Sequence, residues 1–344
     1  MTGSIHWPLA SRIAQSTAGS DPFEASYHFS RFAADADDLV ARAAPAVAAE
    51  MGMEWASDPT VRVVTRRQWA DANIDGFSRL LAPAEELLAK PGGLGIGRAL
   101  ASRLLAAEVG ALVGILGRRV LGQYELVLPA GDDGDTILFV GANVLLMERQ
   151  NEFRPAEFRY WVALHECTHR LQFTGVPWLR GYFLGLVESL IEASKPQPGR
   201  SRRWVTDMRA AAREGRPMFG EAGLMGLFAT PDQRRVLEQV QALMALLEGH
   251  GHVVMDRIGA RELVTQHTMS RVLKQRRKDP RTAAFFRITG LELKMKQYEM
   301  GERFILDVER RAGFQALDAV WTGPDALPSL AEISEPQRWL ERVG

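Results

Sequence analysis

The sequence predicts a mainly α-helical protein that also contains one small β-hairpin or sheet. Apolar residues recur with helical period through most of the 344 residues. Two short apolar runs, Tyr124–Pro129 and Thr136–Gly141, are typical of strands. The segment GDDGD between them predicts a hairpin with a loop longer than two residues. Val61–Val64 is a candidate third strand.

Proline and capping residues predict where the main helices begin. Pro155 suits the first turn of a helix that runs past His169, and Glu157 lies near the positive end of its dipole. Thr230, Pro231 and Gln233 form a capping signal for a second long helix. The other predicted elements are Gly76–Lys90, a helix that Pro83 interrupts; Leu104–Gly117, a helix buried in the core; the helices Leu179–Ala193 and Thr282–Arg311; and an irregular proline-rich tail from Trp321.

The length and the 46% hydrophobic content allow a substantial core in one large or two moderate domains. We expect residues 1–68 to form an N-terminal helical segment packed on a main domain of residues 69–344, or the whole chain 1–344 to be one continuous domain. Glycines between Gly110 and Gly122 predict close helix packing, within one chain or between two. The oligomeric state is left open.

Charge and cysteine content exclude several classes of protein. Lys plus Arg equals Asp plus Glu at 42 each, so the chain has no basic excess with which to bind nucleic acid or an anionic membrane. The N-terminal segment does not resemble a signal peptide, and no apolar run is long enough for a transmembrane helix. The single cysteine, Cys167, fits a reducing compartment. We therefore expect a cytoplasmic protein.

The segment HECTH, His165–His169, carries the chemistry. On an α-helix the two histidines differ by only about 40° and lie one turn apart on the same face, so they can bind one metal ion. Glu166 lies beside them without having to be a ligand. This is the H-E-x-x-H arrangement of two zinc ligands and a general base. In that chemistry zinc lowers the pKa of water to about 7, and the glutamate accepts the proton as water attacks a carbonyl.

The alternative is a packed helix whose two histidines pair with nearby acids. The surrounding residues are apolar, and two buried imidazoles without partners would be costly there, which favours a metal site. The strand at 136–141, just upstream, could also serve as an edge that holds an extended substrate.

A catalytic zinc site needs a third protein ligand and one open position. Glu248, His252 and Asp256 form one helical stripe, and we choose Glu248 as the ligand because it lies nearest the apolar face. His252 is the alternative ligand, and Asp256 could orient a histidine from outside the ligand set. Gly249 and Gly251 suggest that another helix or a metal comes close. The full set of candidates is Glu188, Glu192, Glu248, His250, His252 and Asp256.

The remaining cysteine, histidine, tyrosine and basic residues of note are expected to have structural rather than catalytic roles. Cys167 lies on the far side of the helix from His169 and is expected to be a small core residue. His250 and His267 are expected to be structural. Tyr298 could donate to an oxyanion, but packing is the more frequent role of such a tyrosine. The basic run Arg271–Arg281 is interpreted as a solvated face.

Several segments resemble an actinobacterial family with a zincin-like metallopeptidase signature, described as candidate zinc-dependent hydrolases; one branch is associated with coenzyme F420 biosynthesis. The resemblance covers about Trp69–Trp339. It implies a mainly helical fold around the HExxH helix, zinc at His165, His169 and Glu248, and Glu166 as base. The segments that carry it are VLGQYELVLP, GANVLLMER, FRYWVALHECTHRLQFTGVPWLRGYFLGL, ALLEGHGHVVMD and LELKMKQYEMGERFILDVER.

Three hypotheses follow from the sequence. The first is a zinc-dependent hydrolase, most plausibly a metallopeptidase, acting on a peptide or small-molecule amide. The second is a non-catalytic helical metal-binding or scaffold protein associated with F420 biosynthesis, favoured by a closed site with His252 or Asp256 as fourth ligand. The third is metal-assisted chemistry on a cofactor precursor in a compact pocket.

Overall fold

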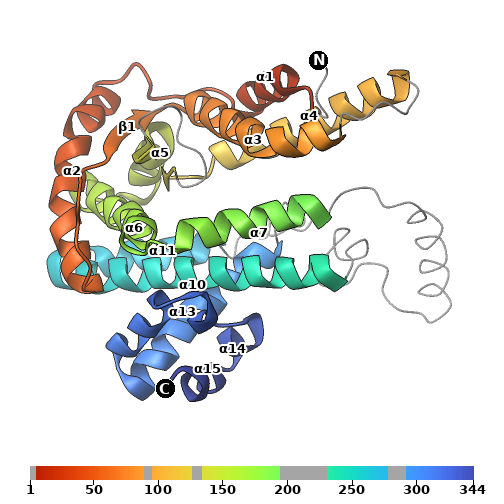
Figure 1. The fold of residues 1–344 in the computed structure, drawn as a ribbon. Helices are drawn as coiled ribbons and strands as arrows, with labels where there is room; N and C mark the ends of the chain where they lie inside the picture. The colour runs from red at the N-terminus through yellow and green to blue at the C-terminus, as the bar shows by residue number, and fades with distance from the viewer. Residues whose placement is uncertain (1–4, 89–94, 126–133, 194–230, 278–291) are drawn as a thin grey trace. The chain divides into compact units, whose positions relative to one another are not determined.

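The structure is a computed structural model that describes residues 5–88, 95–125, 134–193, 231–277 and 292–344. It is mainly helical with a small three-stranded sheet, as the sequence predicts (Figure 1). The chain forms two compact units, one of residues 1–177 and 254–272 and the other of residues 178–253 and 273–344. The sequence-predicted division at residue 69 stays a prediction.

The first unit is built around the sheet. Its elements in chain order are α1 (Trp7–Ala18), α2 (Tyr27–Met51), β1 (Thr60–Val64), α3 (Arg66–Leu88), α4 (Gly95–Gly117), β2 (Gly122–Tyr124), β3 (Thr136–Val140), α5 (Gly141–Asn151), α6 (Pro155–Gly175), the C-terminal end of α10 (Pro231–Glu262) and most of α11 (Gln266–Arg277).

The strand order is β1-β3-β2, with β1 parallel and β2 antiparallel to β3. The predicted pairing of the two runs near 124 and 136 is therefore confirmed, and so is the third strand; residues 126–129 of the predicted strand lie outside the described part of the chain. The expectation that the strand at 136–141 is an edge is wrong. Because β1 pairs with its other side, β3 is central, and all five of its residues are buried.

Helices cover both faces of the sheet. Leu138 and Val140 belong to an apolar cluster with residues of α1, α3 and α4. Phe139, which points to the opposite face, packs on Phe32 of α2 with ring centroids 5.6 Å apart. The sheet thus separates the α1–α3–α4 layer from the layer that contains α2 and α6.

Helix α4 packs on α1 through glycine. A Cβ atom built on Gly110 would lie 2.4 Å from the carbonyl oxygen of Ala10, and one on Gly114 would lie 2.5 Å from that of Ala14. The close packing predicted for these glycines therefore occurs within one chain. The predicted burial of Leu104–Gly117 holds for part of the helix only: Ala106 and Val113 are buried in the apolar cluster, whereas Leu104 and Leu105 are 63% and 41% exposed.

Helix α3 corrects a second prediction. It starts at Arg66, earlier than the predicted Gly76, and its helical backbone continues through Pro83 to Leu88. Proline lacks the N–H of the helical ladder, yet a helix continues past it when neighbouring packing outweighs the loss. Leu81, two residues before Pro83, packs against the apolar cluster to which Trp69, Ala70 and Ile74 of the same helix belong.

The C-terminal end of α10 is held to α2 by charge. Arg257 and Arg261 both donate hydrogen bonds to the carboxylate of Glu50, whose side chain is buried. Nearby, the hydroxyl of Tyr160 donates to Glu262 at 2.8 Å. Burial raises the pKa of the Glu50 carboxyl, but the hydrogen bonds and charges of the two arginines outweigh it, so the net pKa lies below the ordinary value of 4.5.

We expect Glu50→Gln to reduce the free energy of unfolding at neutral pH. A carboxyl whose folded-state pKa is lowered stabilises the fold above its unfolded pKa, and that stability is lost as the pH falls through the folded value. The difference between wild type and variant, measured by chemical denaturation, should therefore shrink below about pH 4.5. A difference that stays constant from pH 7 to pH 3 would contradict this account.

The second unit contains α7 (Leu179–Ala193), most of α10, α13 (Glu292–Ala312), η1 (Phe314–Trp321), η2 (Pro324–Ala326), α14 (Leu330–Ser334) and α15 (Pro336–Val343). Apolar residues of α10, including Ala245 and Leu246, pack with Phe304 and Val308 of α13 and with the C-terminal helices. The start of α10 at Pro231 and the bounds of α7 agree with the sequence prediction. Thr230 and residues 282–291 of the predicted last helix lie outside the described residues.

Two glycines allow α10 and α13 to approach closely. A Cβ on Gly249 would lie 2.3 Å from the carbonyl carbon of Gly301, and one on Gly301 would lie 1.8 Å from the carbonyl oxygen of Ala245. The expectation that Gly249 allows another helix to come close is therefore confirmed.

We expect Gly301→Ala to lower the free energy of unfolding by about 3 kcal/mol, because the added methyl group meets backbone that cannot move aside. Gly185→Ala is the matched control, since a Cβ on Gly185 meets nothing within 4 Å and alanine favours helix. Denaturation of both variants checks this, and equal stability of the two would show that the crossing can relax.

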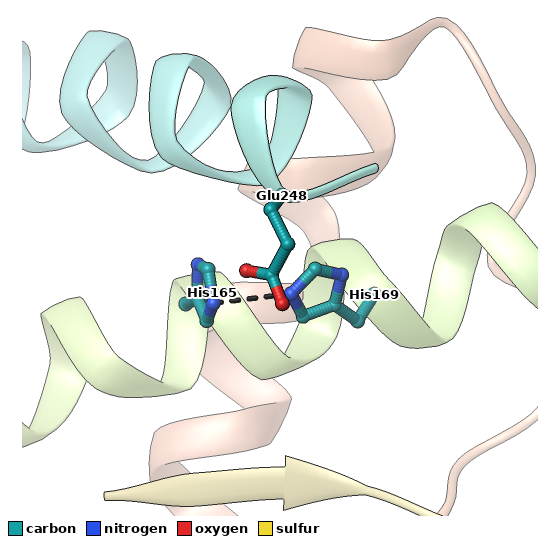
Figure 2. A group of neighbouring side chains, drawn as sticks. All are labelled: His165, His169 and Glu248. Carbon is teal, nitrogen blue, oxygen red and sulfur yellow. Dashed lines mark hydrogen bonds between the residues drawn. The ribbon is translucent and has the colours of Figure 1, made fainter. Parts of the chain in front are cut away.

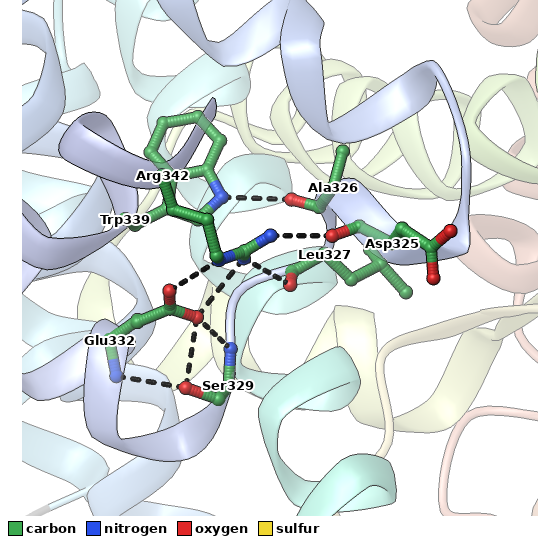
Figure 3. A network of polar contacts seen from close by, with 7 residues as sticks. All are labelled: Asp325, Ala326, Leu327, Ser329, Glu332, Trp339 and Arg342. Carbon is green, nitrogen blue, oxygen red and sulfur yellow. Dashed lines mark hydrogen bonds and ion pairs between the residues drawn. The ribbon is translucent and has the colours of Figure 1, made fainter. Parts of the chain in front are cut away.

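The tail after Trp321 is helical, in contrast to the irregular segment predicted. Ser329 and Glu332 form a capping box that starts α14, and Pro336 occupies the first turn of α15. Arg342 donates to Glu332 and to the carbonyl oxygens of Asp325 and Leu327 (Figure 3). The sequence prediction failed because two turns stabilised by such contacts resemble a loop in composition. The fully buried Trp339 then joins the tail to Phe304.

In the part of the chain that the structure describes, no helix is both long and apolar enough to span a membrane.

Candidate metal centre

Helix α6 carries the HECTH segment and is buried along most of its length. It begins at Pro155, as predicted, with Glu157 in its first turn. Two ion pairs hold the helix in place. Arg159 donates to both oxygens of Glu148 at 2.7 and 2.9 Å, and Arg170 donates to both oxygens of Asp135 at 2.7 and 2.5 Å. The second pair joins α6 to the start of β3.

The two histidines face each other across one helical turn. Their Nε2 atoms are 3.0 Å apart and the ring planes are nearly perpendicular, at 80°. Two nitrogen ligands of one tetrahedral zinc ion, each at about 2.0–2.1 Å, would be roughly 3.3 Å apart. The side chains therefore direct the same nitrogen atom toward a common point, as the sequence spacing predicts.

Glu248 brings a carboxylate to the same place. One ligand atom each from His165, His169 and Glu248 lies within 4.8 Å of the others, and each residue is half-buried. Figure 2 shows the Glu248 side chain directed at the two imidazoles. Two imidazoles and one carboxylate are a common donor set of zinc, so these residues fit the ion that the motif implies.

Glu166 is 4% exposed and lies against β2. A Cβ atom on Gly122 would be 2.5 Å from Oε1 of Glu166, so the carboxylate occupies the space that a side chain at 122 would fill. In the sequence Gly122 stood out only as the last glycine of the Gly110–Gly122 stretch, with no role in the site. Its only other signal was its place at the start of an apolar run.

We expect Gly122→Ala to displace the Glu166 carboxylate and to lower the free energy of unfolding by about 1–3 kcal/mol. Gly76→Ala, in the same unit, is the control. A Cβ there meets nothing within 4 Å, and alanine in a helix should raise stability by up to about 1 kcal/mol. Chemical denaturation measures both. Unchanged stability of Gly122→Ala would mean that Glu166 moves aside freely.

The other predicted ligands lie in different surroundings. Nδ1 of His252 is 2.7 Å from the carbonyl oxygen of Glu248. Asp256 accepts hydrogen bonds from Gln266 at 2.8 Å and Ser270 at 3.0 Å. Neither residue belongs to the group of converging ligand atoms. Glu188 is exposed on α7, and the side chain of Glu192 lies outside the described part.

The residues interpreted as structural are placed as follows. Cys167 is fully buried, and burial raises the pKa of its thiol, so it is a core residue as expected. His250 is buried between Phe314 and Trp321, with ring centroids 6.0 and 5.2 Å away. The side chain of Tyr298 lies outside the described residues, and so do residues 278–281 at the end of the basic run.

Gln172 is a residue of the site that the sequence analysis missed. Its Oε1 lies 2.9 Å from Nδ1 of His169, and its side chain is fully buried. The signal was available, because residues three apart on a helix are neighbours.

The mainly helical fold carries the H-E-x-x-H segment, and its two imidazoles together with the Glu248 carboxylate could hold a metal ion. The family model of the zincin-like metallopeptidases matches residues 5–340. The chain belongs to that family, which covers nearly its whole length. The family implies a metal, typically zinc.

One solved structure resembles the chain over its whole length. It is a crystal structure from Chloroflexus aurantiacus, described as that of a candidate hydrolase with a novel fold. It has 31% sequence identity and a TM-score of 0.73, and the match covers 98% of each chain. No curated protein matches the chain.

Proposed function

We propose that the protein is a zinc-dependent hydrolase of peptides or small-molecule amides. His165, His169 and Glu248 would hold the ion, and Glu166 would act as general base. The observation that carries the proposal is the convergence of the three ligand atoms within 4.8 Å. The family and the hydrolase description of the structural relative support it.

Three protein ligands leave a position open, which is the arrangement of catalytic rather than structural zinc. When bound, zinc polarises a carbonyl group and lowers the pKa of water to about 7. The contacts of His252 and Asp256 also favour an open site over a closed one. The His252 side chain contacts the backbone carbonyl of Glu248, and the Asp256 carboxylate accepts hydrogen bonds from Gln266 and Ser270. Both side chains are therefore engaged in contacts other than metal ligation.

Glu166 supplies the proton transfers. Its carboxylate accepts a proton from the attacking water and can return that proton to the leaving nitrogen. Its buried position against the backbone of Gly122 restricts the conformations it can adopt. A carboxylate held in one place loses little conformational entropy when it reacts.

Strand β2 is the candidate edge for an extended substrate, in place of β3. It flanks β3 in the described sheet, and Gly122 places its backbone beside Glu166. A peptide that pairs with an exposed strand edge is held by main-chain hydrogen bonds largely independent of its sequence. The side chain of Gln123 is directed the other way, toward Asn73 of α3, with both amide contacts at 3.3 Å.

Metal analysis of the purified protein is the first test. We expect about one zinc per chain in wild type, and loss of the ion in His165→Ala, His169→Ala and Glu248→Ala. Glu166→Gln should keep zinc. Glu188→Gln, which changes an exposed carboxylate on α7, is the matched control and should also keep it.

Hydrolysis is measured on a mixed peptide library by mass spectrometry. We expect cleavage by wild type, loss after chelation, recovery with zinc, and a loss of at least about 100-fold in Glu166→Gln. Zinc binding without any cleavage would support the non-catalytic metal-binding alternative instead. Absence of zinc after reconstitution would refute both. Membership of the F420-associated branch and a cytoplasmic location stay predictions.

A further inference from the structure

We propose that Gln172 is a positioning residue of the metal centre, which fixes the tautomer and the ring plane of His169 so that Nε2 is available to the ion. This inference rests on the proposed zinc site and adds a residue that the HExxH motif does not contain.

The first step is the contact itself. Oε1 of Gln172 lies 2.9 Å from Nδ1 of His169, within hydrogen-bonding distance. An amide oxygen only accepts, so Nδ1 must carry the proton. A neutral imidazole carries one proton, and its other nitrogen then has a free lone pair. That nitrogen is Nε2, which lies 3.0 Å from Nε2 of His165.

The second step concerns the cost of placing an amide there. The side chain of Gln172 is fully buried. Its neighbours in the sequence, Leu171 and Phe173, are buried too. Burial of an amide is unfavourable unless its hydrogen bonds are satisfied, and an apolar side chain would fill the same space at lower cost. A buried amide at this position is thus a polar choice, and its contact with His169 is one of the interactions that compensate its burial.

The third step is the choice of an amide over a carboxylate. Glu166 and Glu248 already give the centre two acidic side chains, which balance the charge of a divalent ion. A neutral acceptor at position 172 orients the imidazole without adding a third negative charge. Partners of this kind typically change metal affinity by about 10–100-fold.

Zinc affinity of three variants, measured by competition with a chromophoric chelator, tests the proposal. Gln172→Met keeps length and volume but removes the acceptor, and we expect it to weaken zinc binding by about 10–100-fold. Gln172→Glu keeps the acceptor and should bind zinc at least as tightly as wild type. Thr174→Ala is the control, because it removes a hydrogen bond to the carbonyl of Arg170 on the same helix. Its zinc affinity should not change.

A purely structural role for Gln172 would give a different pattern. Gln172→Met and Gln172→Glu would then lose zinc alike, or Gln172→Met would bind it as wild type does. Either result overturns the proposal.

The tautomer of His169 gives a readout that does not need zinc. In the metal-free protein with labelled histidine, nitrogen–proton correlation spectra should show His169 protonated at Nδ1 in wild type and Gln172→Glu. Gln172→Met should lose this preference. If wild type binds no zinc but shows the tautomer, the proposed function fails while the role of Gln172 in orienting His169 stands. If His169 is protonated at Nε2 in wild type, the inference fails whatever the zinc content.

Discussion

Helix α6 imposes the main constraint on the structure, because it is buried along most of its length and yet carries charged and titratable residues. Burying a charge without a partner is costly, and removing one member of a buried ion pair typically costs about 3–5 kcal/mol. Arg159 and Arg170 are each matched by a two-oxygen contact, to Glu148 of α5 and to Asp135 beside β3. These pairs fix the helix between its neighbours and so hold the half-buried histidines in place on it.

The polar residues of the HECTH turn are compensated in different ways, and the differences separate function from packing. Thr168 donates to the carbonyl of Leu164 within the helix, and Cys167 is a protonated core residue. His169 instead has an amide partner on one nitrogen and another imidazole at the second. Glu166 is packed against Gly122 of β2. Thr168 and Cys167 are thus accounted for by packing, whereas Nε2 of His169 is directed at the candidate metal position.

The sequence predicted what depends on local signals. Pro155 and Glu157 predicted the start of α6, Pro231 that of α10, and the four-residue spacing of His165 and His169 placed them on one face. It did not predict the central position of β3, which depends on pairing with a strand far away in the chain. It also missed the helical tail, whose short helices depend on contacts such as those of Arg342 and Trp339. Gln172 lies three residues beyond the H-E-x-x-H motif, so the motif alone does not indicate its contact with His169.

The choice of Glu248 as the candidate third ligand draws on packing residues as well as on charge. The sequence offered several acids and histidines between Glu188 and Asp256, and charge alone did not distinguish them. Gly249 follows Glu248 directly, and α13 crosses α10 there with the backbone of Gly301 in contact. A crossing this close leaves no freedom to shift α10 along its axis by even one side chain, since a Cβ at either glycine would collide with backbone. The position of the carboxylate on its helix is therefore set by the core of the second unit, while that of the two imidazoles is set by the ion pairs of α6. Each half of the candidate ligand set is therefore carried by an element that is well packed within its own unit.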